Sequence, residues 1–245
     1  MYRKILLSLL MIASIVAFAQ GRKSVSVLGD SYSTYEGYIE PATNWTWYFT
    51  KPRVETTDVN DVKQTWWHQF IKNNGYKLEK NNSYSGSTVC YTGYDGADYT
   101  DISFVSRMDN LGSPDIIFIF GATNDSWANV PLGDLIYSGW TPETLKSFKP
   151  ALSYMLDHMS NRYINTEIIY LINDGLNEEL TDAIKEACDH YGIRYIALKD
   201  IDKTAGHPNQ HGMTQIADQI NQALKNKSVD KSCQTFRHTS RNKRI

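Results

Sequence analysis

The sequence predicts an α/β protein, a three-layer sandwich in which helices cover both faces of a parallel sheet of about five strands. Short apolar segments alternate with longer amphipathic segments along the chain. Two of the apolar segments, 117–120 and 168–172, lack the polar alternation of a half-exposed strand. Uninterrupted apolar strands are typical of parallel sheets that are buried on both faces.

The strands are predicted at 25–28, 76–79, 115–120, 167–172 and 193–198, and the second is the weakest of the five. Helices are predicted between them at 61–74, 141–163, 177–191 and 210–225. The first of these helices places Trp66 and Phe70 on one face and ends before Gly75. Pro150 lies inside the second, which is therefore either a kinked helix or two short ones.

Residues 1–19 have the pattern of an export signal. Arg3 and Lys4 precede an apolar run that is short for a membrane span, and Ala17-Phe18-Ala19 is typical of a cleavage site. An uncleaved N-terminal anchor is the alternative. We expect a periplasmic or secreted protein with no stable membrane association after cleavage, one domain over 20–225, and a basic, disordered tail over 226–245.

Charge and cysteine content exclude two classes of protein. Two of the 25 basic residues lie in the leader, and seven lie from Lys225 onward together with one of the 27 acids. The remaining core has 16 basic and 26 acidic residues, a net charge near −10, which makes nucleic acid an improbable partner. Three cysteines are too few for a disulfide scaffold, and the spacing leaves open whether Cys90 and Cys188 pair.

Residues 32–60 interrupt the alternation of strands and helices with a long segment rich in tyrosine and tryptophan. Its aromatic content argues against disorder. It is either an aromatic plug over the edge of the sheet or a wall of the substrate cleft. On the second interpretation we expect Tyr32, Trp45 and Trp47, with Trp127 from a later loop, to bind substrate.

Four polar segments lie where predicted strands end or where the last helix begins, so a parallel sheet would bring them to one edge. They are Gly29-Asp30-Ser31, Asn81 to Thr88, Gly121 to Asp125, and His207-Pro208-Asn209. A serine hydroxyl is a weak nucleophile that needs a base, and His207 is of the right type. The backbone amides of Ser31 and Gly86 and the side-chain amide of Asn124 are candidate oxyanion donors.

In this order the four segments resemble those of the SGNH (GDSL-type) hydrolases, including exported members from Bacteroidetes. The resemblance covers the chain from Gly29 to Met213. It implies a flavodoxin-like sandwich and a serine esterase without metal or other cofactor. It also implies that Ser31 is the nucleophile, His207 the base, and Gly86 and Asn124 the oxyanion donors.

Two positions depart from the family pattern. Ala122 stands where the family has glycine, and Thr204 stands where it has the aspartate that orients the histidine. We expect Asp202 to take that role, with Asp200 as the alternative; otherwise a backbone carbonyl orients His207 and the site is a dyad.

These residues predict an exported esterase that removes small acyl groups, O-acetyl groups above all, from carbohydrate. The substrate is thus a small-molecule or glycan ester. A lipid esterase or thioesterase is one alternative, and a catalytically silent carbohydrate-binding protein on the same fold is another. We expect His211 to face solvent, and Asp30 and Asp125 to have structural roles.

Overall fold

A five-stranded, fully parallel sheet forms the centre of the protein, seen in a computed structural model that describes residues 21–52 and 54–241, with side chains up to Lys225. The strand order is β2-β1-β3-β4-β5. The strands are β1 (Ser24–Gly29), β2 (Lys77–Ser83), β3 (Ile116–Phe120), β4 (Glu167–Ile172) and β5 (Arg194–Ala197). The order reverses at β1, so the loops after β1 and β3 diverge at a switch point of the kind where open α/β sheets place their sites.

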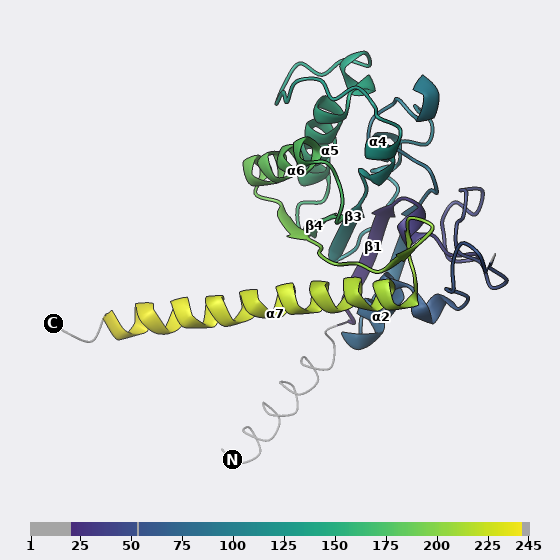
Figure 1. The fold of residues 1–245 in the computed structure, drawn as a ribbon. Helices are drawn as coiled ribbons and strands as arrows, with labels where there is room; N and C mark the ends of the chain where they lie inside the picture. Colours follow the sequence, from purple (N-terminus) through teal and green to yellow (C-terminus); the bar gives the residue numbers. More distant parts are fainter. Residues whose placement is uncertain (1–20, 53, 242–245) are drawn as a thin grey trace, which may run out of the picture.

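Helices cover both faces of this sheet, as Figure 1 shows. The α-helices are α2 (Trp66–Asn73), α3 (Phe104–Arg107), α4 (Thr123–Trp127), α5 (Phe148–Arg162), α6 (Glu178–Tyr191) and α7 (Gln210–Arg241). Helix α2 packs beside α7, and α5 packs beside α6. A two-stranded antiparallel hairpin, β6 (Lys203–Thr204) and β7 (His207–Pro208), precedes α7.

The hydrophobic core consists of two layers separated by the sheet. Alternate residues of β3 face opposite layers: Ile117 and Ile119 pack with α5 and α6, whereas Phe118 and Phe120 pack with α2 and α7. Because all five residues of β3 are buried, the strand needs an apolar side chain at every position. This explains the uninterrupted apolar segment in the sequence and confirms the predicted fold class.

The predicted strands and helices are present, with differences at their ends. The region 141–163 divides at Ser147 into a 3-10 turn, Thr144–Lys146, and the helix α5. Pro150 is the third residue of α5, and a proline is tolerated there because first-turn N–H groups have no partner inside the helix. The export signal over 1–19 lies outside the described residues. The tail over 226–245 lies beyond the described side chains.

The aromatic segment 32–60 packs onto the layer of α2 and α7 through part of its residues. Tyr32, Tyr35, Tyr48 and Val59 are buried in that layer. Trp45, in contrast, is 70% exposed. The segment is therefore both a plug over the sheet and a source of exposed aromatic surface.

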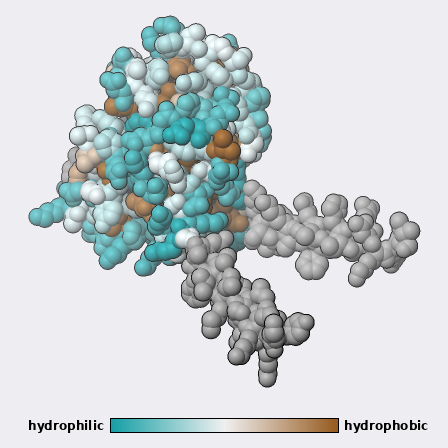
Figure 2. Space-filling view, turned by 180° about the vertical axis from the view of Figure 1, so that it is seen from behind, coloured by the Kyte–Doolittle hydropathy of each residue, from teal (hydrophilic) through white to brown (hydrophobic). Residues whose placement is uncertain are grey.

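The surface shows no broad apolar face in the view of Figure 2, where hydrophobic residues form small patches among hydrophilic ones. Among the helices that the structure describes, none has the length and apolar character needed to cross a membrane.

Gly121 leads from β3 into α4 and has no room for a side chain. A Cβ at this position would lie 2.4 Å from Cζ of Phe104, which is fully buried. We predict that Gly121→Ala lowers the free energy of unfolding by ~1–3 kcal/mol, because the Phe104 ring must leave its packed position. Denaturant unfolding measures this change. Gly21→Ala is the control, since nothing lies within 4 Å of its Cβ. Equal stability of both variants would contradict the prediction.

Candidate active site

Ser31 and His207 meet at the carboxyl edge of the sheet although they are far apart in the chain. Ser31 begins a short 3-10 turn directly after β1, and His207 lies on β7. Oγ of Ser31 is 3.0 Å from Nε2 of His207, and both residues are buried. A serine and a histidine at this distance can exchange a proton.

The other nitrogen of His207 faces the backbone. Nδ1 lies 3.1 Å from the carbonyl oxygen of Ala205. With an N–H donated to that carbonyl, Nε2 carries the lone pair that faces the Ser31 hydroxyl. Among the described residues, no carboxylate is within hydrogen-bonding distance of His207. The pair is thus arranged as a dyad, the third of the possibilities that the sequence left open.

Asp202, the preferred acid, does not contact His207. Its carboxylate is 2.7 Å from Nδ1 of His211, and both side chains are exposed. The hairpin explains this difference. Thr204 pairs with His207, and the two residues between them, Ala205 and Gly206, both have positive φ. A two-residue turn of this kind places the Ala205 carbonyl, and not the Asp202 side chain, beside the imidazole.

Asp200, the alternative acid, is also exposed, and the two ring nitrogens of His207 are hydrogen-bonded to Ala205 and Ser31 instead. Its backbone has a φ of 54° and leads from β5 toward the hairpin. His211 faces solvent, as the sequence predicts.

Burial sets the charge state of His207. Desolvation lowers its pKa to about 4; the Ala205 carbonyl opposes this shift and the Lys203 ammonium adds to it. The imidazole is therefore neutral near pH 7 and can accept a proton.

Three aromatic rings surround the imidazole of His207. Trp47 lies parallel to it, with ring centroids 3.6 Å apart and an interplanar angle of 8°. Tyr32 and Trp127 form T-shaped contacts with it, with ring centroids 5.3 and 5.6 Å away. Tyr32 is buried and donates a hydrogen bond to the Gly206 carbonyl at 2.5 Å. It therefore supports the histidine loop, and its expected role in substrate binding stays a prediction.

The other two tryptophans expected to bind substrate, Trp45 and Trp127, are exposed. Trp127 is 48% exposed and forms a T-shaped contact with His207. Trp45 stacks on Tyr84 at 6.1 Å, and its carbonyl accepts a hydrogen bond from the Ser85 backbone.

Gly86 and Asn124 supply N–H groups at the same edge. Gly86 has a φ of 88°, and a Cβ built on it would meet nothing within 4 Å. No hydrogen bond inside the described part of the chain occupies the backbone N–H of Gly86 or of Ser31. Nδ2 of Asn124 donates to the Ser87 carbonyl at 3.0 Å, which leaves its second hydrogen available.

Ala122 has a φ of 77° and precedes α4, which carries Asn124. The departure from glycine thus places an alanine in the left-handed region, where its Cβ is unfavourable. Ala122 is fully buried in the layer of α5 and α6, and this packing holds its backbone in the strained conformation.

Two residues that shape the site have no motif in the sequence. Tyr94 donates its hydroxyl to Oδ1 of Asn124 at 2.8 Å and so fixes which way the amide faces. Arg107 is buried and donates to the Gly29 carbonyl at 3.2 Å and to Oγ of Ser87 at 2.8 Å. A lone arginine or tyrosine is indistinguishable from a surface residue until the tertiary contacts are known.

Two buried carboxyl groups near the site, those of Asp30 and Asp125, have the structural roles that the sequence predicts. Asp30 accepts a hydrogen bond from the Tyr32 backbone, and Asp125 accepts from that of Val89. Burial raises the pKa of each to about 7.

Cys90 and Cys188 are free buried thiols. Within the described residues, no group of three or more potential metal ligands is found.

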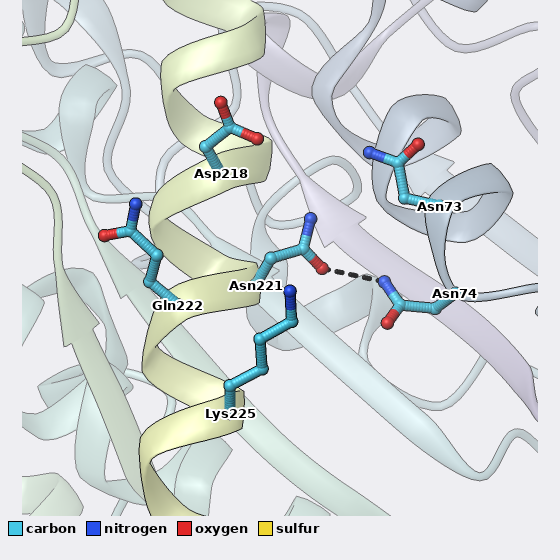
Figure 3. Close-up of a pocket in the computed structure, with 6 residues that line it drawn as sticks. All are labelled: Asn73, Asn74, Asp218, Asn221, Gln222 and Lys225. Carbon is cyan, nitrogen blue, oxygen red and sulfur yellow. Dashed lines mark hydrogen bonds between the residues drawn. The ribbon is translucent and has the colours of Figure 1, made fainter.

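A polar pocket of ≈ 550 Å³ lies elsewhere, between α2 and α7. Figure 3 shows Asn74 and Asn221 joined across it by a hydrogen bond of 2.8 Å. Asn73 and Asn74 directly precede β2, so this pocket lies toward the edge where the strands begin. It is separate from the edge that carries Ser31 and His207.

Comparison with known proteins identifies the family. The family described as GDSL-like lipase/acylhydrolase matches residues 23–224. The chain belongs to this family. It is accordingly an ester hydrolase with the α/β fold of that group. No curated protein matches the sequence.

Solved structures agree with this assignment. A GDSL-like lipase assigned in Bacteroides ovatus is 58% identical, with a TM-score of 0.83 over 84% of this chain and 100% of its own. A GDSL-like lipase from Bacteroides uniformis is 50% identical and has a TM-score of 0.82; the match covers 85% of this chain and 98% of that protein. A family two carbohydrate esterase from Clostridium thermocellum, in complex with cellohexaose, is 14% identical and has a TM-score of 0.57. The match covers 84% of this chain and 64% of the esterase. This likeness concerns the fold alone.

We predict that the acid limb of the kcat/KM profile for ester hydrolysis lies near pH 4, because His207 must be neutral to accept a proton and its pKa is about 4. Activity then falls as pH decreases through that value, and not near the ordinary histidine value of 6.5. A pH–rate profile with NMR titration of the His207 ring measures both. An acid limb near 6.5 would contradict the burial of a neutral imidazole.

Tyr94→Phe removes the hydroxyl that orients the Asn124 amide. We expect kcat to fall about fivefold to tenfold, with KM for a small aryl ester unchanged, because one neutral hydrogen bond is worth ~1 kcal/mol. Tyr137→Phe is the control, since its hydroxyl contacts the exposed Glu186 at 3.4 Å. Steady-state kinetics on the two variants decide the matter, and an unchanged kcat in Tyr94→Phe would show that Asn124 is oriented without it.

Proposed function

We propose that this protein is an exported serine esterase that removes small acyl groups, O-acetyl groups above all, from carbohydrate. The observation that carries the proposal is the 3.0 Å contact between Oγ of Ser31 and Nε2 of a neutral, buried His207. Neutral imidazole facing a serine hydroxyl is the arrangement that acyl transfer requires.

The reaction follows from this geometry. The Ser31 proton passes to Nε2 of His207 while Oγ bonds to the acyl carbon, and the carbonyl electron pair moves onto oxygen. The oxyanion then collapses and expels the alcohol, which takes the proton from His207. Water repeats both steps with Ser31 as the leaving group, which yields the carboxylic acid and the free enzyme.

In this proposal three N–H groups stabilise the oxyanion: the backbone amides of Ser31 and Gly86 and the side-chain amide of Asn124. Arg107 ties the strand before Ser31 to the loop that carries Gly86, so these donors keep a fixed spacing. Donors held in advance avoid reorganisation during the reaction, and the loss of one typically costs about 100- to 1000-fold in kcat.

Exposed aromatic rings favour a sugar as the alcohol part of the ester. Trp127 contacts His207, Trp45 stacks on Tyr84, and both tryptophans have exposed ring surface. Flat aromatic faces suit the apolar faces of sugar rings. Similarly folded proteins include carbohydrate esterases from Clostridium thermocellum and an acetyl xylan esterase from Butyrivibrio proteoclasticus, which makes carbohydrate esters the first substrates to test.

Export completes the proposal and depends on the predicted signal over residues 1–19. After cleavage the enzyme would be periplasmic or secreted, without stable membrane association. There it would meet glycan esters as its partners, while the acidic core disfavours nucleic acid.

Ser31→Ala tests the nucleophile. We expect turnover of an aryl acetate to fall by at least about 10⁴-fold, and labelling by a fluorophosphonate to disappear, because no hydroxyl remains to form the acyl enzyme. Ser138→Ala, in an exposed loop, is the control. Wild-type turnover in Ser31→Ala would contradict the mechanism.

A series of aryl esters from acetate to octanoate, together with acetylated xylan, tests the substrate class in the same assay. We expect the shortest acyl group and the acetylated polysaccharide to be preferred. Activity that rises with acyl length would instead indicate a lipid esterase or thioesterase. Glycan binding without labelling of Ser31 would indicate a silent binding protein.

A further inference from the structure

Trp47 lies against the catalytic histidine in a way that neither the motif nor the reaction requires. Its indole covers the His207 ring face to face at 3.6 Å and 8°. Trp127 and Tyr32 are inclined to the same ring, at 66° and 62°. Trp47 is the one of the three whose ring is stacked parallel on the imidazole.

The backbone holds Trp47 at this place from two sides. Its N–H donates to Oγ1 of Thr34 at 2.9 Å, and that hydroxyl in turn donates to the Ser31 carbonyl at 3.0 Å. The next residue, Tyr48, is fully buried and donates to the Pro208 carbonyl at 2.8 Å. Trp47 is thus positioned by hydrogen bonds that end on the residues carrying the nucleophile and the base.

In a dyad, the positive charge that forms on His207 during catalysis has no carboxylate to stabilise it. When Ser31 transfers its proton, His207 becomes a cation in a buried place, and burial disfavours that charge. In the triad a carboxylate offsets this cost. Here the groups that face the ring are the Ala205 carbonyl, the Lys203 ammonium, and the neutral rings of Tyr32, Trp47 and Trp127. Lys203 opposes the new charge, although it pairs with Asp174.

We propose that the indole face of Trp47 stabilises the imidazolium of His207 during acyl transfer and so takes over, as a positioning residue, part of what the carboxylate does in a triad. The negative face of an aromatic ring attracts a cation within about 6 Å, most strongly tryptophan and most strongly away from water. The attraction appears as the charge develops, so it favours the transition state over the ground state. The proposal rests on the esterase function proposed above.

Fluorinated tryptophans introduced at position 47 test this directly. Each added fluorine withdraws electron density from the ring face with little change in size. We expect kcat for a small aryl acetate to fall stepwise, by about tenfold across the series, while KM changes by less than ~twofold. The pKa of His207, followed by NMR, should fall in the same order, because the cation loses its partner.

The same residues introduced at position 140 provide the matched control. Trp140 contacts Ser153 and Tyr154 on the layer of α5 and is not part of the site. We expect no change there in kcat or in the pKa of His207. Trp47→Phe is a second variant that keeps a weaker aromatic face, and we expect its kcat to lie within the range of the fluorinated series.

Two outcomes would overturn the proposal. If Trp47 acts only by excluding water, the isosteric series leaves kcat and the pKa of His207 unchanged, and Trp47→Phe raises that pKa toward 6.5. These outcomes are distinct from failure of the proposed function, in which the wild-type protein hydrolyses no ester. In that case the NMR titration still tests whether Trp47 stabilises the charged ring.

Discussion

The buried guanidinium of Arg107 is the constraint on which the geometry of the site depends. A charge without solvent must be surrounded by acceptors, and Arg107 finds them in carbonyls at the ends of β1 and β2 and in the hydroxyl of Ser87. Burial lowers its pKa only to about 9, so it remains charged at neutral pH. The need to satisfy this charge fixes the turn that carries Ser31 against the loop that carries Gly86. The nucleophile and the oxyanion donors thereby form one rigid unit.

The histidine is held by different forces. It lies on a short hairpin that is separate from the main sheet, and its orientation comes from one backbone carbonyl and three aromatic rings. Two of these rings come from the segment 32–60, which follows Ser31 directly. The long aromatic insertion therefore has a structural purpose that its composition alone did not reveal. It connects the nucleophile and the base, which are separated by 176 positions in the chain.

How far the sequence could predict the site depended on the kind of residue. The sequence indicates Gly86, Asn124 and the Ser31–His207 pair because the chemistry demands particular residue types at the ends of parallel strands. It favours Asp202 as the acid because Asp202 is close to His207 along the chain, but proximity along the chain does not control the direction of a side chain. A tight turn with positive φ at Ala205 and Gly206 decided that direction. Tyr94 and Arg107 have no sequence signature because their importance comes from long-range contacts.

The sequence by itself determined the class of fold, the family, and the set of polar residues at the carboxyl edge of the sheet. The alternation of strands and helices follows from local patterns of burial, which a sequence records directly, whereas the order of the strands in the sheet does not. The tertiary structure alone decided that the histidine is paired with a carbonyl in place of a carboxylate, that Trp47 lies on its face, and that Tyr32 is buried beneath it. These features depend on side chains from distant segments filling the same space, and packing of that kind has no signature in any one segment.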